Sequence, residues 1–595
     1  MVSEARFVVL YLFVIFTALA TSFRTAIASP KGHRYNVGDD IPLFVNKVGS
    51  MYNPSETYPY YDFPFCRPDP VIEKKRTLME VLNGDILTNS LYVLKFRENK
   101  KFERLCEKKL TKDEVAKFRD AVSNDFYLQM YYDDLPLWLG FGDTEEDEDW
   151  FHSEIPPLYY LYSHIKFDVL YNENQVIEVQ AFSDLQDGVD ITDDIETNVT
   201  FTYSVVWSKT EAPFVNRMGK YSVASFLLDI VKLRSFSLIY RIVIIAKLIG
   251  MLATLLLQNL RDDIIKSSMV NEEGMKEVGW KYTHGDAFSN PPYTSLLCAV
   301  LGTGTQLLTL FFFVFLLVLL GVLYPYSHGT LYSSLVVIYA FTSMVGGYTA
   351  SSFHVQLAGT SLRRTILLAG VLYFVPLFAI FLVLNKVAIS YRITASISFN
   401  TIVVLLLIWT LLSILMFTIG GVLGYTFKSH FRASCSTRRG PKETTTLAWY
   451  RKTLAQMFLS GVLSFCTVIM ELDYIYTSLW CHNIFTESGT FFIMFILLII
   501  YTAILSIGMT YVQLLGEDHE WCWRSVLRGG SVSIFMYGYC IDFYSRSTMS
   551  GFMQLLFFFG YNACICYALF LVLGTVGFYA SLVFVRHVYH AVKNE

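Results

Sequence analysis

The sequence predicts a polytopic α-helical membrane protein with nine transmembrane helices and an N-terminal β-rich lumenal domain. Of its 595 residues, 53% are hydrophobic and 16% charged, whereas a soluble protein carries about a quarter charged residues. Apolar runs longer than about 18 residues, enough to cross a bilayer as a helix, recur through the second half. Residues 29–235 hold 23 Lys and Arg against 35 Asp and Glu, and residues 236–595 hold 22 against 15. The first third is therefore an acidic water-soluble domain, and the remainder lies in the membrane.

A secretory signal peptide is predicted at residues 1–28. Arg6 precedes an apolar run that ends at Ala20, and small residues follow at 26–28. This is the pattern of a cleaved signal, and an uncleaved anchor helix is the alternative. A signal places residues 29–235 in the secretory lumen.

Period-two patterning predicts β-strands in this lumenal part. Residues 164–169 and 199–205 alternate apolar and polar side chains, as strands with one buried face do, and an Asn-rich break at 172–175 marks a turn. Residues 111–121 have the pattern of a helix with acidic residues in its first turn. We therefore expect a β-rich domain over residues 29–235, built as a sandwich with a small helical insertion.

Two modifications fit a lumenal address. Asn198-Val199-Thr200 is a glycosylation sequon without proline. Cys66 and Cys106 form an even pair, so a disulfide is expected in an oxidising compartment, with two buried free thiols as the alternative.

No catalytic, cofactor or metal site is predicted. The chain contains no H-E-x-x-H, G-x-S-x-G, Walker A or G-x-G-x-x-G motif, so we expect that it is not an enzyme. The acidic run 143–149 lacks the spacing and glycine of a calcium loop and is expected to be a solvated surface loop. Residues 517–520 hold one His among acids, and Trp521 and Trp523 after them favour an interfacial aromatic belt over a zinc site. No strongly basic face indicates a nucleic-acid partner.

The second half contains nine apolar segments long enough to span the bilayer. Each must be helical, because backbone amides find no water to bond in hydrocarbon. The segments are residues 236–260, 298–324, 331–352, 365–385, 400–426, 455–475, 489–515, 526–545 and 552–585. They predict a nine-helix transmembrane domain over 236–585 and a cytosolic tail at 586–595. Glycines at 346–347 and 420–421 predict close helix packing.

The distribution of basic residues predicts the topology. With a lumenal N-terminus, nine spans place the C-terminus in the cytosol. The predicted cytosolic loop 427–453 holds seven Lys and Arg, whereas the predicted lumenal loops 325–330 and 476–488 hold none. Positive residues gather on the cytosolic side of membrane proteins, so this bias supports the orientation.

Ionisable residues within the spans are candidate functional groups, because charge is costly in hydrocarbon. Glu471 and Asp473 lie near the lumenal end of the sixth segment and Asp542 near that of the eighth. They could form a proton or cation site, but side chains at the interface that water reaches are the favoured interpretation. In the first segment, Arg241 is expected to extend to the lumenal surface and Lys247 to face other helices.

The chain resembles the transmembrane 9 superfamily, the nonaspanin or endomembrane protein 70 family, over its full length. The matching stretches are Tyr60-Tyr61-Asp62-Phe63-Pro64-Phe65-Cys66, Lys95-Phe96-Arg97, Phe201-Thr202-Tyr203-Ser204-Val205, Gly279-Trp280-Lys281-Tyr282, His284-Gly285-Asp286, Gly302-Thr303-Gly304-Thr305-Gln306, Tyr324-Pro325-Tyr326, Gly347-Tyr348-Thr349-Ala350, residues 517–520 with Trp521, and Met549-Ser550-Gly551-Phe552-Met553-Gln554. The sequence departs from the family pattern at Cys522, which interrupts three consecutive tryptophans, and at Arg241, Lys247 and Asp542, where uncharged residues are expected.

The resemblance implies a multi-pass protein of Golgi and endosome membranes that sorts and localises other membrane proteins. Its implied partners are client transmembrane proteins, the lipid bilayer and the COPI vesicle coat. The family's C-terminal K-x-[DE] signal, which binds that coat and retains the protein in the Golgi, matches Lys593 and Glu595. The alternative is an ion- or solute-coupled transporter or channel of endomembranes that uses Glu471, Asp473 or Asp542, although the sequence has no clear internal repeat to support it.

Overall fold

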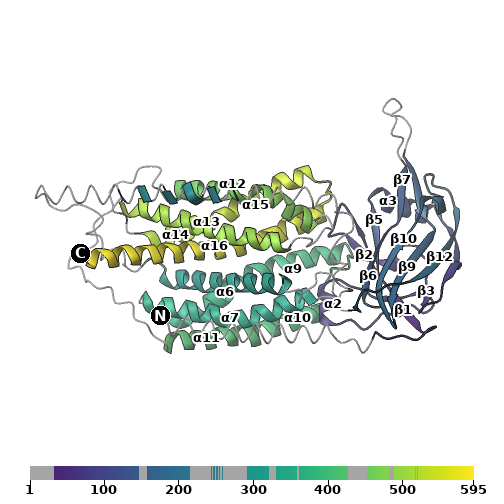
Figure 1. Cartoon of the computed structure of the whole chain (residues 1–595), viewed down its shortest axis with the longest axis horizontal. Coiled ribbons are helices and arrows are strands. Elements are labelled where there is room, and N and C mark those ends of the chain that lie inside the picture. The colour runs from purple at the N-terminus through teal and green to yellow at the C-terminus, as the bar shows by residue number, and fades with distance from the viewer. Residues whose placement is uncertain are drawn as a thin grey trace, which may run out of the picture.

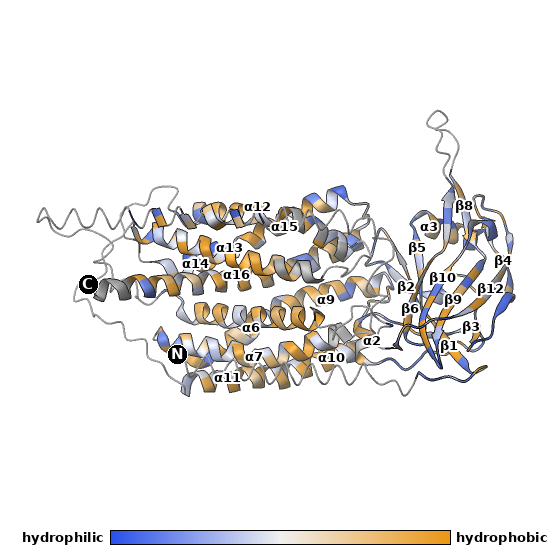
Figure 2. Cartoon of the chain, viewed as in Figure 1, coloured by the Kyte–Doolittle hydropathy of each residue, from blue (hydrophilic) through white to orange (hydrophobic). Residues whose placement is uncertain are grey.

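The computed structural model describes residues 33–145, 157–214, 217, scattered positions between 243 and 261, 291–319, 330–357, 359, 361–426, 452–480, 488–515, 518 and 520–594. A β-rich domain lies at one end of a bundle of long helices (Figure 1). The helices are mostly hydrophobic along their length, whereas hydrophilic and hydrophobic residues mix along the strands (Figure 2). This arrangement confirms a multi-pass helical protein with an N-terminal β-rich domain. We call the bundle end next to that domain the proximal end, and the other the distal end.

The β-rich domain contains twelve described strands in three sheets. The strands are β1 Asp40–Ser50, β2 Thr57–Pro59, β3 Thr88–Lys95, β4 Lys100–Leu110, β5 Phe126–Tyr132, β6 Leu135–Gly140, β7 Gly142–Glu145, β8 Leu158–Tyr162, β9 His164–Asn172, β10 Gln175–Phe182, β11 Gly188–Asp190 and β12 Thr197–Lys209. The strand orders are β2-β1-β5-β6 with β3 also on β1, β10-β9-β12-β4, and β11-β8-β7. Strands β9 and β12 are parallel, and the other pairs are antiparallel.

One hydrophobic core joins the two larger sheets. Leu94 and Tyr132 from the first sheet and Phe167 and Val205 from the second have no exposed surface and belong to the same cluster. The domain is therefore a sandwich, and the alternation over 164–169 and 199–205 identifies two of its central strands. Of the acidic run expected to be a loop, residues 143–145 belong to strand β7 instead, and residues 146–149 lie outside the described residues.

The predicted helical insertion is α3, Lys112–Ser123. Thr111 begins it with a capping box: its hydroxyl accepts from the Glu114 backbone N–H, and the Glu114 carboxylate accepts from the Thr111 N–H at 2.9 Å. This backbone N–H lowers the pKa of the Glu114 carboxyl. Val115 and Phe118 are fully buried in the sandwich core, so the helix closes one edge of it. The remaining short helices are α2 Leu78–Leu82, η2 Tyr60–Asp62 and η3 Leu185–Asp187.

The membrane half is helical throughout its described part. Its helices are α6 Thr294–Leu319, α7 Thr330–Gln356, α8 Leu362–Leu372, α9 Phe374–Ser390, α10 Phe399–Ile408, the π-helix η8 Trp409–Ser413, α11 Ile414–Thr426, α12 Thr453–Trp480, α13 Ser488–Leu515, α14 Trp521–Gly530, α15 Val532–Arg546 and α16 Phe552–Asn594. Six helical stretches of the described residues are long and apolar enough to cross a membrane. The count of nine stays a prediction, as does the tail boundary at 586, which lies within α16.

The first predicted span, 236–260, is described only at scattered helical positions. Lys247 is among them, and its side chain is exposed. The prediction that Lys247 faces other helices is therefore wrong. A long lysine side chain can extend along the outside of a helix and carry its ammonium toward the membrane surface.

Helices α6, α7 and α11 lie side by side (Figure 1) and approach closely through glycines. A Cβ atom on Gly347 would collide with the Phe417 carbonyl oxygen, and one on Gly420 would collide with the Met344 carbonyl oxygen. Small residues at such crossings let membrane helices gain van der Waals contact along their backbones.

Candidate functional site

The β-rich domain is attached to the helices through the loop between β1 and β2. The Asn53 side-chain oxygen accepts from the Ser550 backbone N–H at 3.0 Å, and the Ser55 N–H donates to the Gln554 side-chain oxygen at 3.1 Å. Ser550 and Gln554 lie at the start of α16, within a stretch that carries the family resemblance. These motif residues therefore form part of the joint between the two halves.

A second contact joins Thr57, the first residue of β2, to the turn between α9 and α10. The Thr394 N–H donates to the Thr57 carbonyl at 2.9 Å, and their hydroxyls lie 2.7 Å apart. The buried Asn385 of α9 fixes this turn by bonding both backbone groups of Ile397, at 2.7 and 3.1 Å. A movement of α9 or α10 at the proximal end would therefore change the contact between Thr394 and Thr57 of the β-rich domain.

Two of the three predicted intramembrane acids come together at the proximal ends of α12 and α15. Arg546 Nη2 lies 2.9 Å from Asp542 Oδ2 and 3.3 Å from Asp473 Oδ1. The Tyr539 hydroxyl donates to Asp473 at 3.0 Å. The three charged side chains are 45 to 58% exposed, and the Glu471 side chain lies outside the described residues.

Arg546 was missed from the sequence, although its position four residues after Asp542 is the spacing of a helical ion pair. The three side chains together keep one net negative charge, but each is about half exposed, so water reaches and screens them. This geometry favours the interface interpretation over a proton or cation site.

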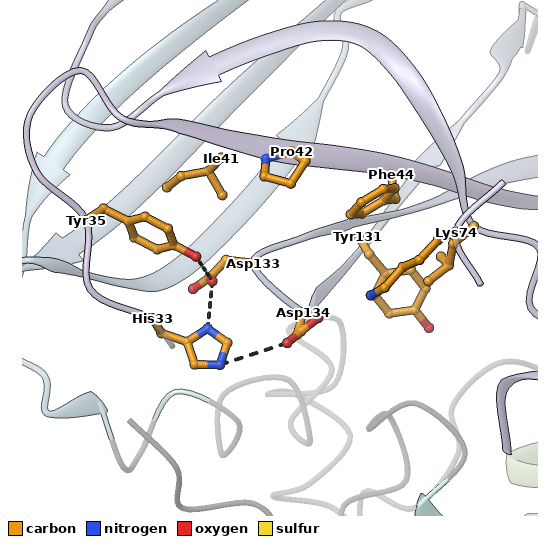
Figure 3. Close-up of a pocket in the computed structure, with 10 residues that line it drawn as sticks. His33, Tyr35, Ile41, Pro42, Phe44, Lys74, Tyr131, Asp133 and Asp134 are labelled. Atoms are coloured by element: carbon orange, nitrogen blue, oxygen red, sulfur yellow. Dashed lines mark hydrogen bonds and ion pairs between the residues drawn. The ribbon is translucent and has the colours of Figure 1, made fainter. Parts of the chain in front are cut away.

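The β-rich domain contains a pocket of about 190 Å³ beside the turn between β5 and β6 (Figure 3). Asp133 and Asp134 form that turn with φ angles of 50° and 62°, the left-handed conformation of a tight hairpin. The Asp133 carboxylate is 1% exposed and contacts His33 Nδ1 at 2.7 Å, the Tyr35 hydroxyl at 2.5 Å and Arg217 Nη1 at 2.8 Å. Asp133 thus ties the chain before β1 to the chain after β12.

The other side of the pocket combines an aromatic wall with a cation. Lys74 Nζ lies 5.2 Å from the centre of the Phe44 ring, and Tyr131 stands beside them (Figure 3). Across the pocket, the Asp134 side chain is 52% exposed. The lining therefore offers both signs of charge to a small polar ligand, and no sequence motif indicated it.

The predicted disulfide, glycosylation site and C-terminal signal lie apart from one another in the structure. Cys66 and Cys106 are joined by a disulfide with their Cα atoms 6.0 Å apart. Asn198 is exposed on β12, where a glycan would meet no packed neighbour. The backbone of Lys593 belongs to α16, while its side chain and Glu595 lie outside the described residues.

The acidic stretch before α14 is a packed joint at the distal end. Asp518 is 3% exposed and pairs with Arg524. Trp521 is 2% exposed and stacks on Phe578 at 5.5 Å, so the interpretation of Trp521 as an interfacial belt residue is wrong. Tertiary contact with α16 covers the ring that a lone helix would leave at the membrane surface. No group of three or more metal-binding side chains gathers among the described residues.

Fold and contacts together define a multi-pass membrane protein with a docked β-rich domain. The family model described as Endomembrane protein 70 matches residues 57–552. The chain is 50% identical to transmembrane 9 superfamily member 5 of Arabidopsis thaliana, over 98% of this chain and 99% of that protein. It is 35% identical to member 1 of Bos taurus over 94% of each, and 33% identical to putative phagocytic receptor 1b of Dictyostelium discoideum over 98% and 99%. No solved structure matches. The chain belongs to the transmembrane 9 superfamily.

Proposed function

We propose that the protein is a non-enzymatic sorting factor that localises other membrane proteins within Golgi and endosome membranes. The β-rich domain faces the lumen in this proposal, and the C-terminus faces the cytosol. Client transmembrane helices bind in the bilayer, and the tail residues Lys593 and Glu595 bind the COPI coat, which retains the protein in the Golgi. Family membership supports the general role, and one feature of the bundle supports the mode of client binding.

That feature is a pair of spans in which few residues are fully buried, although α8 and α11 each pack against a neighbouring helix. In the most apolar stretch of Leu362–Ser390, 11% of residues are buried, and in that of Phe399–Thr426, 17% are. The corresponding figure is 61% for both Ser334–Gln356 and Phe552–Val588. The first two spans therefore each keep an exposed outer face, where a client helix can pack against them in the bilayer.

The same pair of spans is linked to the β-rich domain. The turn between α9 and α10 bonds to Thr57 through Thr394. A client that shifts α9 or α10 therefore changes a contact of the domain on the proximal side. Through this link, binding of a client helix in the membrane would affect the β-rich domain outside the membrane.

Tryptophan substitutions on the exposed faces test client binding. Val383→Trp on α9 and Leu411→Trp on η8 enlarge side chains that are 59% and 71% exposed. Both should reduce the co-purification of client membrane proteins after crosslinking in cells. The matched control is Val583→Trp on α16, which is 66% exposed on a well-buried span and should leave capture unchanged. Equal capture by all three variants would contradict binding at α9 and η8.

Surface proteomics of cells lacking the protein tests the sorting role. A specific set of membrane proteins should disappear from the surface and return on rescue with the wild type. Lys593→Ala combined with Glu595→Ala should move the protein out of the Golgi, whereas Asn594→Ala should not, because it leaves both charges of the signal. A surface proteome that is unchanged by the knockout would refute sorting, and unchanged localisation of the tail variant would refute coat retention.

A further inference from the structure

Arg528 of α14 is a buried charge inside the helical bundle, with none of its surface exposed. Three of its donors reach neutral oxygens: Nε donates to the Arg524 carbonyl at 3.1 Å, Nη1 to Gln456 Oε1 at 3.3 Å and Nη2 to Thr510 Oγ1 at 3.1 Å. A guanidinium carries five N–H groups. Two of them, one on each terminal nitrogen, therefore have no acceptor among the described residues.

No described carboxylate lies within 4.0 Å of this guanidinium. Asp518 is the nearest buried acid along the chain, but it pairs with Arg524 and also accepts the Glu520 N–H. Glu520 is 62% exposed, so water screens its charge. Buried charges in proteins are ordinarily paired, because an isolated ion loses its hydration without compensation. No carboxylate among the described residues therefore bonds Arg528 directly, and Asp518, which shares its charge with Arg524, acts on it only from a distance.

The face of α13 that carries Thr510 includes further polar groups without partners. Thr502, Ser506, Thr510 and Gln513 lie three or four residues apart and so share one face of α13. Gln513 is 3% exposed, yet neither atom of its amide has a hydrogen-bond partner. The hydroxyls of Thr502 and Ser506, on residues 2% and 1% exposed, have none either.

We propose that Arg528 holds a small inorganic anion of the chloride class, with Thr510 and Gln513 as its neighbours in an enclosed site between α12, α13 and α14. The free groups of Arg528 and Gln513 include four N–H donors, two on each side chain, and N–H donors bind anions. A fixed positive charge with no carboxylate bonded to it among the described residues repels cations. Gln456, Thr510, Gln513 and Arg528 are all under 5% exposed, so the occupant must be small.

Gln513 indicates where the anion would enter. Gln513 lies two residues before the distal end of α13. Its backbone carbonyl accepts the Asp518 backbone N–H at 3.3 Å. Gln513 therefore lies between Thr510, which contacts Arg528, and the distal end of α13. The hydroxyls of Ser506 and Thr502 continue the polar face toward the middle of the bundle.

The test is chloride-dependent stability of the purified full-length protein in detergent. Unfolding can be followed with a thiol-reactive dye, because Cys298, Cys522 and Cys540 are buried and free. A ligand that binds only the folded state raises the melting temperature in proportion to the logarithm of its concentration once the site is saturated. Replacing gluconate with chloride at constant ionic strength should raise the melting temperature of the wild type, and Arg528→Gln should abolish that rise.

The control is Arg546→Gln, which removes an equally charged side chain that already has two carboxylate partners. It should retain the full chloride response. If Arg528→Gln fails to fold, Gln513→Leu is measured in its place and should weaken the rise in melting temperature with chloride. Saturable binding of radioactive chloride to the wild type tests independently whether the anion binds. A wild type that behaves alike in chloride and gluconate would overturn the proposal. Stabilisation by phosphatidylserine vesicles without any chloride response would overturn it in favour of a lipid headgroup.

Discussion

The helical bundle divides into two parts that treat buried polar side chains differently. In α6 and α7, the Thr303 hydroxyl donates at 2.9 Å to carbonyls of both Ala299 and Ala369, and that of Thr349 donates to Val345. In α12 and α13, the hydroxyls of Ser464, Thr502 and Ser506 and the amide of Gln513 have no partners. The two groups occupy the lower and upper parts of the bundle in Figure 1.

Close helix contact is common to both parts, because a Cβ on Gly529 of α14 would collide with the Leu573 carbonyl oxygen of α16, as one on Gly420 would with that of Met344. In the first part, a threonine on one helix also reaches a carbonyl of another, as Thr303 reaches Ala369 on α8. Gln306 Oε1 and Trp409 Nε1 are the exceptions in this part. The first part therefore behaves as a scaffold whose buried hydroxyls are mostly bonded, whereas several buried polar groups of the second part have no partner among the described residues.

The largest predicted effect concerns close packing in the scaffold. Gly420→Val should destabilise the protein by at least about 3 kcal/mol, because its Cβ collides with a backbone carbonyl that cannot move aside. The variant should lose its monodisperse peak in fluorescence-detected size-exclusion chromatography. The control is Gly538→Val on α15, where a Cβ meets nothing within 4 Å. If Gly538→Val were equally destabilising, the collision of a Cβ with the backbone at Gly420 could not be the cause of the loss.

A pair of isosteric substitutions compares the two parts directly. Thr303→Val removes a bond between helices and should cost about 1 kcal/mol. Thr502→Val removes a hydroxyl that has no partner, and should be neutral or stabilising within about 0.5 kcal/mol. The measurement is the unfolding free energy of each full-length variant in the same detergent. Equal losses from both variants would show that Thr502 has a partner in solution.

A third prediction extends the comparison to a bonded polar group outside the membrane. His164 is 6% exposed, with its ring nitrogens 2.8 Å from the Thr202 hydroxyl and 3.0 Å from that of Ser204. Burial lowers the pKa of His164, and nearby Asp187 partly opposes this shift. The unfolded ring titrates near about 6.5, so protons bind the unfolded state first as the pH falls.

Stability should therefore be full above that pH and decline as the pH falls through it toward the lower folded pKa. His164→Gln should flatten this part of the profile, because the amide does not titrate. The check is the melting temperature of both proteins across a pH series in constant salt. Parallel profiles for wild type and His164→Gln would refute a role for this ring.

Several features follow from local sequence patterns. The helix at 112–123 could be predicted because Thr111 and Glu114 form its cap within one turn. The alternation over 164–169 identifies a strand because each side chain faces core or solvent by position alone. The structure of the acidic run 143–149 could not be predicted from its own residues. Its charge indicated a loop, but pairing with β8 makes residues 142–145 a strand.

The sequence by itself determined the membrane class, the β-rich first domain and most helix positions, because hydropathy and periodicity are properties of neighbouring residues. Only the tertiary structure decided which distant groups meet. Asp473 shares Arg546 across 73 positions, and Ser55 bonds Gln554 across 499. It likewise decided that Arg528, just inside a predicted span, has no carboxylate beside it in the described residues. Charge compensation depends on what the packed helices bring within a few ångströms, and no local pattern encodes that distance.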